Sequence, residues 1–171
     1  MSTSDYKLDA LKAKEKLSEV SPSMCLAKWN QTSLHLPTGL TNSCYHPPLH
    51  KIDANAVNKN PAALHNTQEK LNQRQQMLQG EQPEGCSYCW NIEKTGEMSD
   101  RHYRSGEPWA MQDFEDIRKN PIDEHWTPRY VEVNFNNACN LQCSYCSPQF
   151  STKWGKEIDR YGQYPTSPPH N

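Results

Sequence analysis

The chain has 171 residues, a formal net charge of -2 at pH 7 and a mean hydropathy of -1.01. This charge balance excludes the strongly basic footprint of a nucleic-acid-binding protein, and no apolar run approaches the roughly 20 residues of a membrane-spanning helix. The number of cysteines, seven, is odd, and the chain does not begin with the charged and then apolar segment of a signal peptide. These features argue against a secreted disulfide-bonded protein, so we expect a soluble, cytoplasmic one.

The supply of large apolar side chains is small. Leu, Ile, Val and Phe number 12, 5, 4 and 3, which is about 14% of the chain, whereas globular chains reach roughly 20%. Such a chain cannot bury enough apolar surface to offset its backbone entropy unaided. We therefore expect metal centres to staple part of it and another part to be disordered.

The first predicted element is a short amphipathic helix over residues 5–20. Leu8, Leu11 and Leu17 recur near helical spacing among lysines and glutamates, which is typical of a helix with one apolar side. Because the charges alternate in sign, we expect the polar side to be a solvated face of a surface element and not a binding patch.

A β-hairpin is predicted next. Residues 29–36 and 40–44 have strand character, and the intervening segment contains proline and glycine. Cys25 precedes the first strand and Cys44 closes the second, so the hairpin would bring both thiols to one end of the ribbon. The gap of eighteen residues between them is too long for a zinc knuckle.

Residues 45–60 carry two adjacent prolines and little periodicity, which indicates a connector. His46 and His50 lie in it without a regular scaffold, so we interpret them as loop histidines and not as metal ligands. A helix is predicted over residues 61–79, because the segment begins with proline and is followed by Gly80, a favourable C-terminal cap.

Cys86 and Cys89 then form a CxxC motif, which alone fits a redox pair, half of a zinc site or half of a cluster site. The segment after it is polar. Its residues Arg101, His102 and Arg104 could bind an anion, but a solvated linker is favoured. Residues 107–120 have the apolar spacing of a helix.

The most informative stretch follows. Residues 130–135 alternate and are rich in β-branched and aromatic side chains, which predicts a strand. Directly after it, Cys139, Cys143 and Cys146 form a CxxxCxxC triplet in a loop, where three thiols can converge on one inorganic centre. Tetrahedral zinc requires four protein ligands, so three cysteines favour a four-iron cluster with one open iron over zinc or buried free thiols.

The segment CNLQCSYC, preceded by the strand VEVNF, resembles the signature of radical SAM enzymes. The resemblance implies that Cys139, Cys143 and Cys146 hold a 4Fe-4S cluster whose open iron binds S-adenosylmethionine. It also implies that Tyr145 packs by the adenine and that Asn140, with Leu141, shapes the loop.

Four cysteines remain, namely Cys25, Cys44, Cys86 and Cys89, which is the number that closes a second centre. The pattern GxxxxC after a hairpin, followed later by CxxC past a helix, resembles the twitch domain, the short relative of the SPASM domain, which carries an auxiliary 4Fe-4S cluster. In most members that domain follows the barrel, whereas here it precedes it. A structural zinc at these four cysteines remains an alternative.

Residues 150–161 are predicted to begin the first barrel helix, and a radical SAM barrel needs about 200 residues, far more than follow. We expect a truncated product, a fragment, or one piece of a split enzyme whose remaining barrel lies on another chain. The fold expected is a small, metal-stapled α+β one. Its four segments are an N-terminal helix over 1–20, a twitch-like module over 21–95, a polar connector over 96–128 and the incomplete barrel over 129–171.

The function expected from the resemblance is reductive cleavage of S-adenosylmethionine to a 5′-deoxyadenosyl radical that abstracts hydrogen from an unidentified substrate. It needs an electron donor and the missing barrel residues. Two other classes stay open. One is a zinc-binding, non-enzymatic interaction module, and the other is an iron-sulfur electron carrier.

Overall fold

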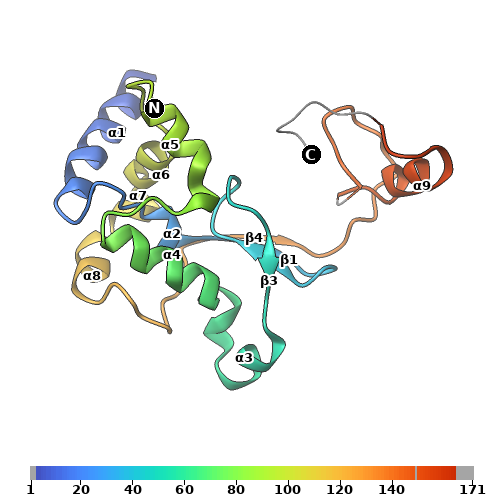
Figure 1. Ribbon diagram of the computed structural model, residues 1–171, viewed down its shortest axis with the longest axis horizontal. Coiled ribbons are helices and arrows are strands. Elements are labelled where there is room, and N and C mark those ends of the chain that lie inside the picture. Colours follow the sequence, from blue (N-terminus) through green and yellow to red (C-terminus); the bar gives the residue numbers. More distant parts are fainter. Residues whose placement is uncertain (1–2, 149, 165–171) are drawn as a thin grey trace. The chain divides into compact units, whose positions relative to one another are not determined.

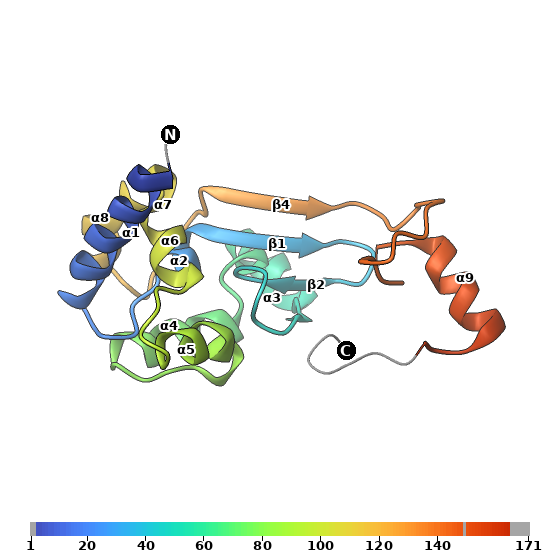
Figure 2. The same ribbon diagram turned by 90° about the horizontal axis from the view of Figure 1, so that it is seen from above.

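The computed structural model describes residues 3–148 and 150–164 of a small α+β protein (Figures 1 and 2). Two compact units are formed: unit 1 comprises residues 1–34 and 39–133, and unit 2 comprises residues 35–38 and 134–171. Within the described ranges, no helix is both long and apolar enough to cross a membrane. The predicted boundaries near residues 20, 95 and 128 fall inside unit 1 or at its end, and the roles assigned to those segments stay predictions.

Unit 1 is built mainly from short helices around the hairpin. The helices and 3₁₀ turns are α1 (Thr3–Ser18), α2 (Ala27–Asn30), α3 (Ala54–Lys59), η1 (Pro61–Leu64), α4 (Gln68–Leu78), η2 (Glu84–Cys86), α5 (Ser87–Glu93), α6 (Asp100–Gly106), α7 (Pro108–Met111) and α8 (Phe114–Lys119). In Figure 2, α1 lies beside α6, and the two helices contact each other.

The sheet has the strand order β3-β2-β1-β4. Its strands are β1 (Gln31–His35), β2 (Leu40–Asn42), β3 (His50–Lys51) and β4 (Tyr130–Asn134). Strands β2 and β3 are antiparallel, with Thr41 opposite His50. Figure 2 shows β1 and β4 pointing the same way and β2 the opposite way. Gly39, with φ of 64°, provides the left-handed conformation that the turn between β1 and β2 requires.

The entry to β4 is fixed by hydrogen bonds to α2 and α8. The backbone N–H of Arg129 donates to the carbonyl of Asn30 at 2.8 Å. The Arg129 guanidinium donates twice to the Asp113 carboxylate, each time at 2.7 Å. Through these bonds a segment about a hundred residues distant in sequence becomes the neighbour of β1.

The apolar core of unit 1 is small and lies between α1, α2, α4, α5 and α8. Its buried members include Leu17, Met24, Leu26, Trp29, Met77, Trp90, Phe114 and Ile117. The indole N–H of Trp29 donates to the Pro121 carbonyl at 2.7 Å, so even the largest core side chain has its polar atom paired.

Polar side chains fill the rest of the interior. Lys28, Lys70 and Arg74 are almost completely buried. The Lys70 Nζ donates to the hydroxyls of Thr32 and Thr41 at 2.8 and 3.0 Å. In the described part of the chain, the shortage of apolar residues is thus met partly by a hydrogen-bonded polar core, which composition alone did not predict.

The first predicted helix exists, but its buried face is different from the one expected. Ala10, Ala13 and Leu17 are buried, whereas Leu8 and Leu11 are 51% and 44% exposed. The error arose because leucines were taken to mark the core side. Close packing of α1 against α6 instead favours alanine at the contact.

Several other predicted elements are confirmed with altered bounds. The hairpin, the strand over 130–135 and the helix over 150–161 correspond to β1 with β2, to β4 and to α9 (Thr152–Tyr161). The helix predicted over 61–79 is interrupted, because Thr67 caps a new helix by accepting a hydrogen bond from the Lys70 N–H. The connector over 45–60 was wrong in part, since it contains β3 and α3.

Residues 107–120 form two short helices, α7 and α8, in place of the single one expected. The solvated linker predicted around Arg101, His102 and Arg104 is wrong, because these residues lie on α6 and the first two are buried. The Arg101 guanidinium donates to both carboxylate oxygens of Glu93, at 2.9 and 2.6 Å. This pairing explains how a charged side chain can be buried there.

Substitution of Gly106 tests the packing of α6 on α1. A Cβ at Gly106 would lie 2.9 Å from the Asp9 carbonyl oxygen, which is backbone and cannot move freely. We expect Gly106→Ala to lower the free energy of unfolding by about 1–3 kcal/mol, measured by denaturant titration. The control is Gly155→Ala in α9, where nothing lies within 4 Å. Equal stability of the Gly106 variant and the parent would contradict this packing.

Substitution of Lys70 tests its burial. Burial, followed by the charges of Arg74 and Lys28, lowers the pKa of Lys70 to about 6. Between pH 6.5 and 8.5 the unfolded chain therefore holds a proton that the folded one lacks, and the stability contributed by Lys70 rises with pH by up to about 1.4 kcal/mol per pH unit. We expect Lys70→Met to remove this rise in metal-free protein. The exposed control, Lys51→Met, should retain it; an unchanged slope in Lys70→Met would refute the burial of the amine.

Candidate functional site

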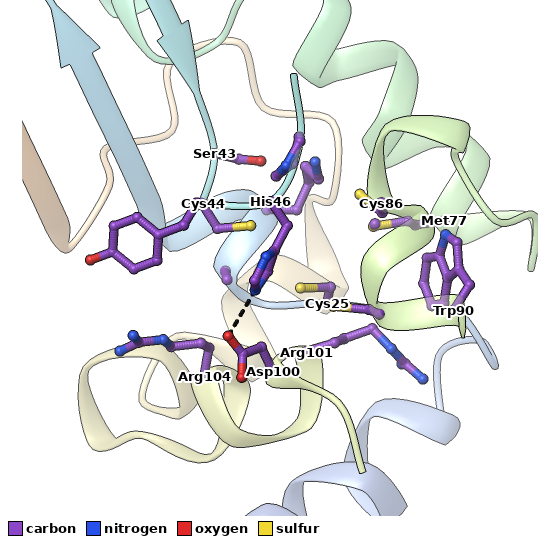
Figure 3. Close-up of a pocket in the computed structure, with 15 residues that line it drawn as sticks. Cys25, Ser43, Cys44, His46, Met77, Cys86, Trp90, Asp100, Arg101 and Arg104 are labelled. Atoms are coloured by element: carbon purple, nitrogen blue, oxygen red, sulfur yellow. Dashed lines mark hydrogen bonds and ion pairs between the residues drawn. The ribbon is translucent and has the colours of Figure 1, made fainter. Parts of the chain in front are cut away.

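Four cysteines that are distant in sequence line one cavity of unit 1, which we call the cysteine cavity. Cys25 precedes α2, Cys44 follows β2, Cys86 ends η2 and Cys89 lies in α5. In Figure 3 the sulfur atoms of Cys25, Cys44 and Cys86 are turned toward the same central space. The cavity has a volume of about 30 Å³, whereas one water needs about 10–15 Å³ by the same measure.

The CxxC arm is held by the start of α5. The Cys86 N–H donates to the carbonyl of Pro83 at 2.9 Å, and the indole N–H of Trp90 donates to the same carbonyl at 3.0 Å. Because Cys86 and Cys89 are three residues apart on one helical turn, both thiols can face the cavity.

The arm that carries Cys25 is held by α4 and α6. The Ser23 hydroxyl donates to the Met77 carbonyl at 3.0 Å, and the Leu26 N–H donates to the Ser105 hydroxyl at 3.0 Å. The Arg101 guanidinium also donates to the Met24 carbonyl at 2.7 Å. The backbone on both sides of Cys25 is therefore fixed before any ligand binds.

Charged and polar side chains complete the wall. They include Lys28, Ser43, His46, Asp100, Arg101 and Arg104. The His46 Nε2 is hydrogen-bonded to the Asp100 carboxylate at 2.8 Å, and the His46 ring stacks on Tyr88 with centroids 3.7 Å apart. His46 thus belongs to the wall of this cavity, although sequence reasoning placed it in a connector.

Three of the thiols hold their protons more tightly than an exposed cysteine does. Burial raises the pKa of the Cys25 thiol. It also raises the pKa of Cys44 to about 11 and the pKa of Cys89 to about 12. The charge of Lys28 acts in the opposite direction on Cys25 and Cys44. Any metal bound here must displace protons, because only thiolates are good ligands.

No disulfide joins these cysteines. Within the ranges that the structure describes, no three His, Cys, Asp or Glu side chains lie close enough together to hold a single metal ion. The cavity therefore brings together the four cysteines that the sequence grouped, while their role as ligands stays a prediction.

The triplet loop, residues 139–146, lies in unit 2 and is anchored to α9. Ser151 caps α9 and donates through its hydroxyl to the Leu141 carbonyl at 2.8 Å, and the Trp154 indole N–H donates to the Cys143 carbonyl at 3.0 Å. These bonds fix the backbone of the loop.

The three triplet thiols are each half-buried. The Cys146 N–H donates to the Cys143 carbonyl at 2.9 Å, which closes a turn between the last two cysteines. A surface hollow beside Cys139 and Asn140 is lined also by Lys153 and Lys156. Tyr145 is 91% exposed. Its contact with an adenine stays a prediction.

Comparisons with protein-family models, with curated proteins and with solved structures find no match for this chain. Function is therefore inferred from the residues and their geometry. Sequence reasoning found the cysteines but missed Lys28, Ser43 and the Arg101–Glu93 pair at the cavity. Only His46 carried a local signal, since it follows Cys44 by two positions.

The raised thiol pKa values can be measured directly. In folded, metal-free protein, the thiolate absorbance of Cys44 and Cys89 should appear only near pH 11 and 12. In guanidinium both steps should move to about 8.5, the value of an exposed cysteine. Cys44→Ser and Cys89→Ser should each remove one high-pH step. Complete deprotonation of the folded parent below pH 9 would contradict the burial of these thiols.

Proposed function

We propose that this chain is an iron-sulfur protein of the radical SAM type, with one cluster in the cysteine cavity of unit 1 and a second, SAM-binding cluster at the triplet loop of unit 2. The observation that carries the proposal is the convergence of Cys25, Cys44, Cys86 and Cys89 on one cavity. Four thiols from three separated segments do not meet by local sequence proximity, and such a donor set is typical of a closed metal centre.

A zinc ion and a four-iron cluster would hold the four sulfurs at different spacings. Zinc holds sulfur at about 2.3 Å in a tetrahedron, which puts the sulfurs about 3.8 Å apart. A four-iron cluster separates its cysteines further, because each thiolate binds a different iron.

The charge of the wall also fits an anionic group. Four thiolates around a 4Fe-4S core or a zinc ion would leave a net charge of about -2, so charge by itself does not separate the two. Lys28 and Arg101 lie in the wall and lower the pKa of Cys25 by their charge. Positive groups beside the donors offset the cost of burying this charge.

The triplet supports the catalytic half of the proposal. Three cysteines in an anchored loop directly after β4 leave one iron without a protein ligand, and a cluster so bound supplies the electron for reductive cleavage of S-adenosylmethionine. The residues of this chain would hold the cluster through Cys139, Cys143 and Cys146 and contact the SAM molecule through Tyr145 and Asn140.

An electron carrier is the second candidate. The cysteine cavity is lined only by residues of unit 1. It therefore offers a complete ligand set that needs nothing from the triplet loop. In that case iron would be bound but S-adenosylmethionine would not be cleaved after reduction by dithionite.

Metal analysis after anaerobic reconstitution tests the proposal. We expect about eight irons and eight sulfides per chain in the parent, and about four of each in Cys143→Ala and in Cys86→Ala. Ser87→Ala, at an exposed position between the two cysteines of the CxxC motif, should match the parent.

Three results would contradict the proposal in whole or in part. Zinc in place of iron in reconstituted protein would leave the zinc-binding interaction module as the better description. Iron that is unaffected by either cysteine substitution would show adventitious binding. Loss of four irons in Cys86→Ala but none in Cys143→Ala would retain the unit 1 centre and remove the radical SAM half.

A further inference from the structure

Ser43 presents a buried hydroxyl without a hydrogen-bond partner to the cysteine cavity. Its side chain is part of the cavity wall and is 2% exposed, and its Oγ has no partner in the described structure. Figure 3 shows Ser43 at the edge of the space toward which the sulfur of the adjacent Cys44 is turned. A buried hydroxyl is rarely left unpaired, so this donor is available to whatever occupies the cavity.

Lys28 contributes a positive charge to the same wall. It is 2% exposed, and its ammonium donates to the Gln73 side-chain oxygen at 2.6 Å. The other basic side chains of the wall have carboxylate partners: Arg101 with Glu93, Arg104 with Glu107, and His46 with Asp100. Lys28 has no carboxylate partner among the ion pairs of the described residues, and its charge therefore acts on the cavity without local compensation.

A second positive charge lies behind Lys28, because the Arg74 guanidinium donates to the Lys28 carbonyl at 3.1 Å. The Lys70 amine, whose pKa is lowered by burial to about 6, is held by two threonine hydroxyls. Glu69 faces this region through its hydrogen bond from the Gln73 amide at 2.7 Å, which makes Gln73 a neutral bridge between Glu69 and Lys28. Met77 and Trp90 also line the cavity.

We propose that Lys28 and Ser43 set the reduction potential of the centre held by the four cysteines, Lys28 through its charge and Ser43 through an Oγ–H···S hydrogen bond. This inference rests on the proposed cluster in unit 1. Reduction adds one electron, taken from a low-potential one-electron donor, and moves no proton in this step. The added negative charge interacts more favourably with the cation and the hydroxyl donor, so both residues raise the potential.

The two residues are assigned as positioning residues and not as ligands. Neither a protonated lysine nor a neutral serine hydroxyl competes with thiolate for iron. Their removal should therefore leave iron and sulfide content unchanged while it moves the potential. A role in folding alone would have the opposite signature, with lost iron and no shift in the potential of the remaining centres.

The test uses the full chain with Cys139, Cys143 and Cys146 changed to Ala, so that only the unit 1 centre is loaded. After iron and sulfide analysis, the midpoint potential is measured by dithionite titration followed by electron paramagnetic resonance. We expect Ser43→Ala to lower the potential and Lys28→Met to lower it further. Lys28→Arg, which keeps the charge, should restore most of the loss.

Ser33→Ala is the matched control for the hydroxyl. Ser33 is also buried, but its Oγ is paired with Glu132 at 3.2 Å and it does not line the cavity. This variant should have the potential of the parent.

Each outcome decides the inference. Parent-like iron content with unchanged potential in both Ser43→Ala and Lys28→Met overturns it and leaves the unit 1 cluster standing. Failure of the parent to bind iron overturns it together with the proposed cluster. If Lys28→Met does not fold, Ser43→Ala decides alone, because that change removes only an unpaired hydroxyl.

Discussion

Two buried basic side chains on α4 connect the elements that build the cysteine cavity. Arg74 donates to the Lys28 carbonyl in α2 and to the Asn66 side chain at 2.8 Å, while Lys70 donates to Thr32 and Thr41 in the hairpin. The segment carrying Cys25 and the hairpin carrying Cys44 are thus tied to the same helix, which also leads into the CxxC arm. In a chain so short of large apolar residues, these polar contacts replace part of an ordinary core.

Buried positive charge gives unit 1 its electrostatic character. Lys28 and Arg74 are buried, and in the described structure neither of them has an ion-pair partner. Four thiolates on a metal centre would supply the missing negative charge and remove protons at the same time. Metal loading and folding of unit 1 should therefore be strongly coupled, and the fixed backbone around Cys25 gives the centre a preformed part.

Features that depend on neighbouring residues, such as cysteine motifs and strand alternation, could be predicted from the sequence. The burial of individual side chains could not, because it depends on residues that are distant in sequence. CxxC, CxxxCxxC and the alternating strand before it can be identified from spacing, and β4 and α9 lie close to their predicted positions. Arg101 was assigned to a solvated linker, because nothing in its neighbourhood shows that Glu93 will pair with it in the interior. The burial of Ala10 and Ala13 on α1 could not be predicted for a related reason. These small residues pack against α6, and nothing in the sequence near α1 shows that α6 is its neighbour.

The central claim is that the four cysteines of unit 1 hold one four-iron centre independently of the triplet loop. The most direct measurement is Mössbauer spectroscopy of ⁵⁷Fe-reconstituted chain in which Cys139, Cys143 and Cys146 are changed to Ala. We expect the spectrum of a diamagnetic four-iron cluster, and we expect it to disappear when Cys25 is also changed to Ala. A spectrum of isolated or aggregated iron, or a cluster that survives the loss of Cys25, would contradict it.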